Sequence, residues 1–148
     1  MTTIFIKPNN GKFCIAIFEH DDASIKLARV SFPDNEPAII DFLENHKPES
    51  VEALMFDGTI YAQTAISIRE QICFPVRIFK EKGKVHDRIE AHSEWLAENM
   101  KYNSEMKNNA DYMRFIRMLS DYSRNNQNCD TTAADLMADA ARYFRRTI

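Results

Sequence analysis

The sequence lacks any long hydrophobic run. Its longest apolar run, residues 13–18, has six residues, and the run at residues 53–56 has four, whereas a transmembrane helix needs about 20. The first seven residues contain no basic segment followed by a long apolar one, so they do not predict a secretory signal. We therefore expect no membrane span and a cytoplasmic location.

Cysteine motifs and excess positive charge are also missing. The three cysteines, Cys14, Cys73 and Cys129, form no CxxC pair, which argues against a disulfide framework or a zinc cluster and predicts buried free thiols. The net charge of −3 gives no overall attraction to nucleic acid, so any DNA contact must be local. Two short basic stretches, residues 80–84 and 142–146, are typical of solvated faces.

The composition is that of a packed domain. The chain has 148 residues, of which 45% are hydrophobic, and ten Phe and five Tyr supply large side chains. This content excludes intrinsic disorder, and the length is that of one domain. We expect a single domain over residues 1–148.

The residue pattern predicts a mixed α/β sheet. Three β-rich segments come first and are separated by turn residues such as Asn9-Asn10-Gly11, which predicts an antiparallel meander with the second strand central. A short helix and a strand–helix–strand unit follow, and this unit requires parallel pairing. The predicted strands are residues 4–6, 13–18, 25–30, 51–56 and 74–79, and the first two predicted helices are 38–43 and 61–72.

The last part of the chain is predicted to be helical and to cover the sheet. Residues 100–109 separate two of its helices and are expected to form a loop, and a final helix is expected to begin at Thr131 or Thr132. The strand at 53–56 is expected beside the strand at 4–6. The predicted core contains Ile6, Ile15, Ile17, Leu54, Phe56, Ile66, Ile78, Trp95 and Leu136.

This order of elements is the ribonuclease-H-like order, and several segments resemble the nuclease domain of phage terminase large subunits. Residues 84–99 contain a Lys, an Arg-Ile pair and a W-L-x-x-N helix, and residues 112–123 contain a Tyr-x-x-Phe helix. Residues 130–140 are similar to the family's DDAxDxLA segment, and Asp57-Gly58 stands in the region of its acidic turn. An intact large subunit also has an ATPase domain with a Walker loop, and no GxxxxGK(S/T) occurs here, so the resemblance implies an excised domain or a separately encoded relative.

The resemblance implies a fold, a reaction and a set of site residues. The fold is a ribonuclease-H-like sheet of five strands covered by helices. The reaction is two-metal hydrolysis of DNA phosphodiesters with Mg²⁺ or Mn²⁺, and the implied catalytic and metal-binding residues are Asp57, Asp130 and Asp135. Lys84 and Arg88 match positions that would contact the phosphates of double-stranded DNA. The implied partners are the terminase ATPase domain, the small subunit or the portal, in a bacterial host cell.

The carboxylate set departs from the family pattern. Lys7-Pro8 stands where the family has an Asp-Pro-like dipeptide, and a protonated lysine cannot bind Mg²⁺. Counting back from Asp135 by the family spacing reaches Thr131 and Thr132, with Asp130 displaced by one residue. Asp139 is expected to solvate the last helix. The superfamily geometry would place Lys7, Asp57 and Asp130 or Asp135 in one cleft, where the lysine ammonium would take over the neutralising role of a cation.

Two functions therefore remain open. The first is a metal-dependent endonuclease domain of a packaging motor with an incomplete carboxylate set. The second is a non-catalytic module, without a cofactor, that binds DNA or a packaging-motor partner. With Lys7 in place, we expect weak or absent Mg²⁺ binding and little nuclease activity.

Overall fold

A mixed sheet forms the centre of the computed structural model, which describes residues 1–46, 51–126 and 128–147. The strands are β1 (Thr2–Asn9), β2 (Lys12–His20), β3 (Ile25–Ser31), β4 (Val51–Asp57), β5 (Val76–Phe79) and β6 (Met100–Tyr102). Their order across the sheet is β5-β4-β1-β2-β3-β6. Strands β1 to β3 are antiparallel, and β4 and β5 run parallel to β1. The predicted α/β class and the antiparallel-then-parallel arrangement are confirmed.

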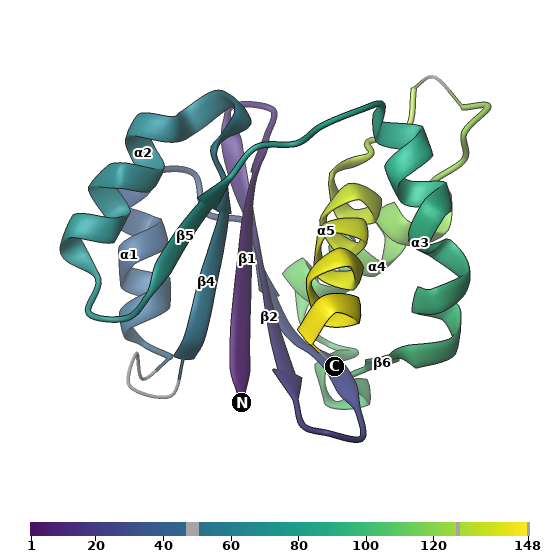
Figure 1. Cartoon of the computed structure of the whole chain (residues 1–148), viewed down its shortest axis with the longest axis horizontal. Coiled ribbons are helices and arrows are strands. Elements are labelled where there is room, and N and C mark those ends of the chain that lie inside the picture. The colour runs from purple at the N-terminus through teal and green to yellow at the C-terminus, as the bar shows by residue number, and fades with distance from the viewer. Residues whose placement is uncertain (47–50, 127, 148) are drawn as a thin grey trace.

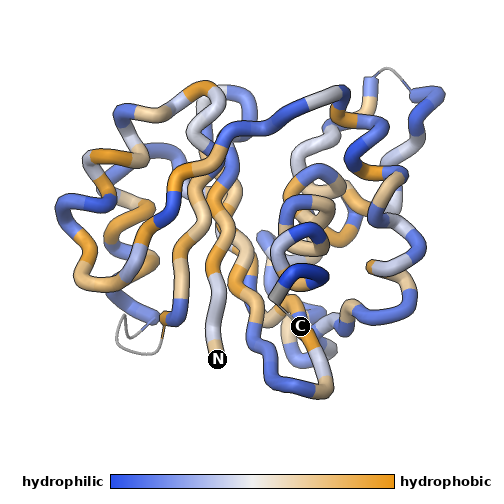
Figure 2. Tube along the Cα trace, in the orientation of Figure 1, coloured by the Kyte–Doolittle hydropathy of each residue, from blue (hydrophilic) through white to orange (hydrophobic). Residues whose placement is uncertain are grey.

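Helices cover both faces of this sheet (Figure 1). Helices α1 (Glu36–Glu44) and α2 (Gly58–Gln71) lie on one face, and α3 (Val85–Asn99), α4 (Ala110–Asp121) and α5 (Thr132–Thr147) lie on the other. Figure 2 shows apolar residues gathered along the strands and alternating with polar ones along the helices. Among the helices that the structure describes, none is both long and apolar enough to cross a membrane.

The pairing of β1 with β4 brings the functional region together. Ile4 lies opposite Leu54 and Ile6 opposite Phe56, which confirms the predicted adjacency of these strands. β1, β4 and β5 are parallel, so their carboxyl ends meet at one edge of the sheet. In α/β sheets this is the edge at which ligand sites form.

One strand was not predicted. Residues 100–109, expected to be a loop, contain β6 and a 3₁₀ turn, η2 (Ser104–Met106), so the sheet has six strands rather than five. β6 pairs in parallel with β3 at its buried Met100, and the nearby Tyr112 hydroxyl donates a hydrogen bond of 2.7 Å to the Leu27 carbonyl. A strand of three residues is too short to show a two-residue period, so only its tertiary contacts define it.

The core follows the prediction in the central strands and on α5, and departs from it on the edge strand β5 and on α2 and α3. Ile6, Ile15, Ile17, Leu54, Phe56 and Leu136 are buried as predicted. Ile66, Ile78 and Trp95 are only half-buried. Trp95 lies on α3, which packs mainly on α5. Ile89 is the one buried residue of α3 in the described chain.

The cysteines differ from one another in burial. Cys14 is buried on β2, as expected for a free thiol that behaves as a small apolar side chain. Cys73 is exposed and Cys129 is partly exposed, so the prediction of buried thiols is wrong for these two. Both follow a helix and lie in connecting segments, where periodicity gives no signal for burial.

Truncation of the sheet core is expected to destabilise the protein. Leu54 is fully buried between β1 and β5, so Leu54→Ala loses apolar burial and leaves a cavity, at a cost of at least about 2 kcal/mol in the free energy of unfolding. Urea denaturation measures this cost. Ile60, whose exposed fraction is 73%, provides the control, because Ile60→Ala should change stability by less than about 0.5 kcal/mol.

Candidate functional site

Four carboxyl groups surround the ammonium group of Lys7. The Lys7 Nζ atom lies 2.7 Å from Asp57 Oδ2, 3.0 Å from Glu81 Oε1, 3.2 Å from Asp135 Oδ2 and 3.5 Å from Asp139 Oδ2. The lysine side chain is only 10% exposed, and each of the four acidic side chains is less exposed than that. We call these five residues the Lys7 cluster.

The sheet edge positions the first members of the cluster. Alternation along β1 directs Phe5 and Lys7 to the face that α5 covers. Asp57 ends β4 and caps α2, because its Oδ1 accepts a hydrogen bond of 3.0 Å from the Thr59 backbone N–H. Glycine is required at position 58, between Asp57 and Thr59, since a Cβ there would lie 2.5 Å from Ile78 Cγ2.

The remaining acids come from α5 and from the segment after β5. Asp135 and Asp139 are one helical turn apart and therefore lie on one face of α5. Glu81 lies two residues beyond the end of β5, and its backbone N–H donates a hydrogen bond of 3.0 Å to the Thr59 hydroxyl. Thr59 thus links the carboxyl ends of β4 and β5.

Arg88 supplies the second cation and is fully engaged within the protein. Its guanidinium binds both oxygens of Asp135, with Nε 3.1 Å from Oδ1 and Nη2 2.8 Å from Oδ2. Nη1 donates to the carbonyls of Gly83 and Lys82, at 2.7 and 3.3 Å. Arg88 Nε is also 3.0 Å from Glu81 Oε2 but is not aligned for a hydrogen bond, which leaves this buried oxygen without a hydrogen-bond partner in the described chain.

Burial and charge shift the proton affinities of the cluster in opposite directions. Burial alone would lower the pKa of Lys7, but the facing acidic groups of Asp139, Asp135 and Asp57 outweigh it and raise that pKa above its ordinary value. Burial would raise the pKa of Asp57, whereas hydrogen bonds from Lys7 and Thr59 bring it below its usual range. Burial and a hydrogen bond with Glu81 raise the pKa of Asp139 to about 10, so the Asp139 carboxyl keeps its proton at neutral pH.

The cluster does not suit a divalent metal while Lys7 is present. Glu81, Asp135 and Asp139 offer oxygens that lie within 4.8 Å of one another, as metal ligands do. However, Lys7 Nζ is within 3.5 Å of an oxygen of each of them. Two unit charges of the same sign at 4 Å repel by about 4 kcal/mol near a protein surface, and a divalent ion doubles this. The ammonium group therefore occupies the position that a cation would need.

Comparison with solved structures identifies the fold. The nuclease domain of the large terminase from bacteriophage SPP1, with bound Mn, matches with a TM-score of 0.64 and 15% identity, over 99% of this chain and 85% of that one. The human cytomegalovirus terminase nuclease domain, Mn soaked, matches with a TM-score of 0.61 and 14% identity, over 93% and 81%. This chain has the fold of a terminase nuclease domain. The resemblance inferred from sequence is thereby confirmed for the fold.

A whole large terminase also matches. The protein from a thermophilic bacteriophage aligns with a TM-score of 0.63 and 13% identity, over 99% of this chain but only 39% of that protein. No protein-family model and no curated protein sequence matches the chain significantly. The likeness to terminase nuclease domains therefore depends on the fold and not on sequence identity.

Within the terminase nuclease fold, the structure brings some of the predicted residues together. Lys7, Asp57 and Asp135 share one site, as expected. Asp130, the alternative to Asp135, does not contact Lys7 in the described chain; its Oδ1 accepts a hydrogen bond of 2.9 Å from the Thr132 N–H at the start of α5. Lys84 is exposed immediately before α3 and makes no side-chain cap.

Two acidic residues of the cluster were not assigned correctly from sequence. Asp139, expected to solvate α5, is 9% exposed and faces Lys7. Glu81 was missed because it stands among lysines, in a stretch interpreted as a solvated face. The available signal was its place just after a strand of the parallel unit, at the edge where Asp57 also lies.

Proposed function

We propose that this chain is a non-cutting module of terminase nuclease fold that binds DNA or a packaging-motor partner. The observation that carries the proposal is the Lys7 Nζ atom, which contacts four carboxyl groups at 2.7–3.5 Å. Lys7 supplies permanently the positive charge that these carboxyls require. A phage packaging motor is the corresponding context, with the terminase ATPase domain, the small subunit or the portal as partners.

The positions of the basic residues support binding without cleavage. Arg88 uses its guanidinium to hold Asp135 and the carbonyls of residues 82 and 83, so its role is to stabilise the cluster. Lys80, Lys82 and Lys84 are exposed in the connection that passes the same edge of the sheet. We propose that these lysines, Lys84 among them, contact DNA phosphates, which need positive charge and no metal.

The test is a plasmid assay at low salt with the natural chain. Supercoiled plasmid incubated with the protein and Mg²⁺ or Mn²⁺ should remain supercoiled, while a mobility shift detects binding of the same DNA. Asp57→Ala is the matched control, because an activity of this site would disappear with it. Metal-dependent nicking by the natural chain that Asp57→Ala abolishes would overturn the proposal.

The second candidate is a metal-dependent endonuclease, and one observation favours it. Glu81, Asp135 and Asp139 have the spacing of a metal-binding group. For this function, Lys7 would have to withdraw from the cluster when a metal binds. Isothermal titration with Mn²⁺ distinguishes the two candidates: heat that fits binding at the micromolar level supports the endonuclease, and its absence supports the non-cutting module.

A further inference from the structure

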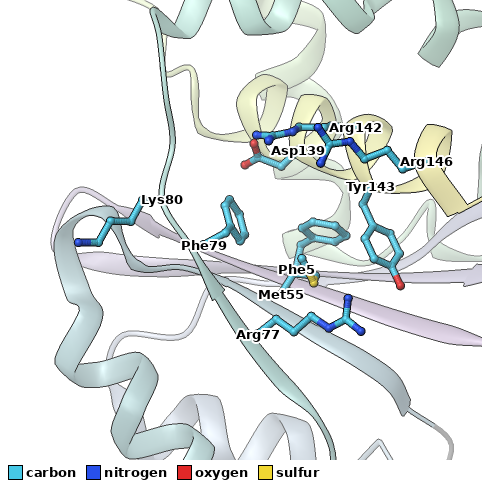
Figure 3. A pocket seen from close by; sticks show the side chains of 9 residues that line it. All are labelled: Phe5, Met55, Arg77, Phe79, Lys80, Asp139, Arg142, Tyr143 and Arg146. Carbon is cyan, nitrogen blue, oxygen red and sulfur yellow. The ribbon is translucent and has the colours of Figure 1, made fainter.

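A pocket of about 290 Å³ lies beside the Lys7 cluster, on the same face of the sheet (Figure 3). Its floor is a row of side chains across three strands, because Phe5 lies opposite Met55 and Met55 lies opposite Arg77. The next row towards the carboxyl ends of the strands contains Asp57 opposite Phe79. The pocket is therefore distinct from the cluster but shares its wall, since Asp139 of α5 borders both.

Arginines stand on opposite sides of this floor. Arg77 comes from β5, whereas Arg142 and Arg146 lie one helical turn apart on α5. All three are exposed, and none forms an ion pair with a carboxylate in the part of the chain that the structure describes. Asp139 is the acidic residue at the pocket wall. Its Oδ2 faces Lys7 Nζ at 3.5 Å, so Asp139 is paired with Lys7 and does not neutralise the arginines.

Aromatic and apolar side chains lie between these arginines. Phe79 and Tyr143 are half-buried, as is Met55 on the floor, and Figure 3 shows the rings of Phe5, Phe79 and Tyr143 between the arginines of α5 and Arg77. Guanidinium groups bind phosphate with two parallel hydrogen bonds, and aromatic faces stack on nucleobases. The pocket thus combines the two kinds of group that bind a nucleotide.

We propose that this pocket binds one unpaired nucleotide, with its phosphate held by Arg77 and Arg142 and its base over the apolar floor. The inference rests on the proposed DNA-binding function and assigns to it a second site, separate from the Lys7 cluster. The nucleotide belongs either to a single strand or to a free nucleoside phosphate, which share this chemistry.

Size and composition favour an unpaired nucleotide over other anions. A volume of about 290 Å³ is at the lower limit of small-molecule pockets and excludes the width of a duplex. An acidic peptide would pair with the arginines but would leave the aromatic floor without a planar partner. Inorganic phosphate would use the arginines alone, so it should bind more weakly than a nucleoside phosphate.

The test measures fluorescence polarisation of labelled dT10 at low salt. Arg77→Glu and Arg142→Glu should each weaken binding by at least about tenfold, because each replaces a phosphate-binding cation by an anion. Arg69→Glu is the matched control, since Arg69 is exposed in the last turn of α2, on the opposite face of the sheet, and the change in net charge is the same. It should change the affinity by less than about twofold. Thermal melting should show unchanged folding in all three variants.

Competition then identifies the source of the nucleotide. If unlabelled dT10 displaces the probe at a lower concentration than dTMP does, the natural ligand is a single strand. If dTMP displaces the probe equally well, the ligand is a free nucleotide. Both results support the pocket. Equal weakening by Arg69→Glu, or displacement by poly-glutamate at the same charge concentration as dT10, would overturn it. A chain that nicks plasmid but keeps this binding pattern would refute only the non-cutting function, so the two failures are distinguishable.

Discussion

The Lys7→Asp variant is expected to bind Mn²⁺ at least about a hundred times more tightly than the natural chain. The substitution removes an ammonium that lies within 3.5 Å of four carboxyl groups and places a fifth carboxylate on β1. Each unit charge at about 4 Å contributes about 4 kcal/mol near a surface, and about 2.7 kcal/mol already corresponds to a hundredfold change in affinity. Oxygen ligands of this kind are those that Mn²⁺ and Mg²⁺ prefer.

Isothermal titration of both proteins with Mn²⁺ measures this gain, and thermal melting provides a second readout. The metal-free variant should melt below the natural chain, and Mn²⁺ should raise its melting temperature in proportion to the logarithm of the metal concentration. Lys7→Met is the matched control, because it removes the ammonium without adding a ligand, and it should bind less tightly than Lys7→Asp. Equal affinity of the natural chain and Lys7→Asp would show that Lys7 does not occupy the cation position.

Removing the lysine charge without replacing it is expected to lower stability severely. Lys7→Met leaves Asp57, Asp135 and the Glu81–Asp139 pair facing one another with Arg88 as the cation that remains in contact with them. Breaking a buried ion pair by deleting one partner costs about 3–5 kcal/mol, because the remaining charges stay buried and unpaired. Urea denaturation at pH 8 measures the loss in the free energy of unfolding.

The stability lost in Lys7→Met should depend on pH, and the carboxyl groups determine the direction of this dependence. Asp139, whose pKa is raised to about 10 in the folded protein, binds more protons in the folded than in the unfolded state between about pH 4 and pH 10. The contribution of Asp139 to the free energy of unfolding therefore falls as the pH rises through that interval. Asp57 has a lowered pKa and contributes in the opposite sense, since its stabilisation is present at neutral pH and is lost in acid.

Without Lys7, protonation of the carboxyls becomes the remaining way to reduce their repulsion. The deficit of Lys7→Met should therefore be smaller at pH 5.5 than at pH 8. Lys12→Met is the control, because the Lys12 side chain is 60% exposed and its ion pair with Asp34 is worth less than about 1 kcal/mol. A Lys7→Met deficit no larger than that of Lys12→Met at pH 8 would contradict the account.

The sheet could be predicted largely from sequence because its signals are local. Strands such as β2 combine an unbroken apolar run with turn residues at both ends, and the strand–helix–strand unit then requires parallel pairing. β6 has no such signal, since it is a three-residue strand defined by its contacts with β3. The half-buried Trp95 shows the same limit, because periodicity on α3 does not reveal that α3 packs mainly on another helix, α5.

The site was predictable where it depends on strand ends and less so where it depends on tertiary packing. Lys7 and Asp57 lie at ends of adjacent parallel strands, so topology alone brings them together. Asp139 and Asp135 share a helix face, but only the packing of α5 on the sheet determines that this face meets Lys7 of β1. The contact of Glu81 with Lys7 depends on the path of the chain after β5, which no local sequence pattern encodes.

The most direct measurement is the anomalous scattering of crystals of the natural chain soaked in Mn²⁺. The account predicts no manganese peak among Asp57, Glu81, Asp135 and Asp139, with Lys7 Nζ still within hydrogen-bonding distance of Asp57, as it is at 2.7 Å here. Soaked crystals of Lys7→Asp should show such a peak and so confirm that the metal reaches the site. A manganese ion bound to these carboxylates in the natural chain, with Lys7 displaced, would contradict the account.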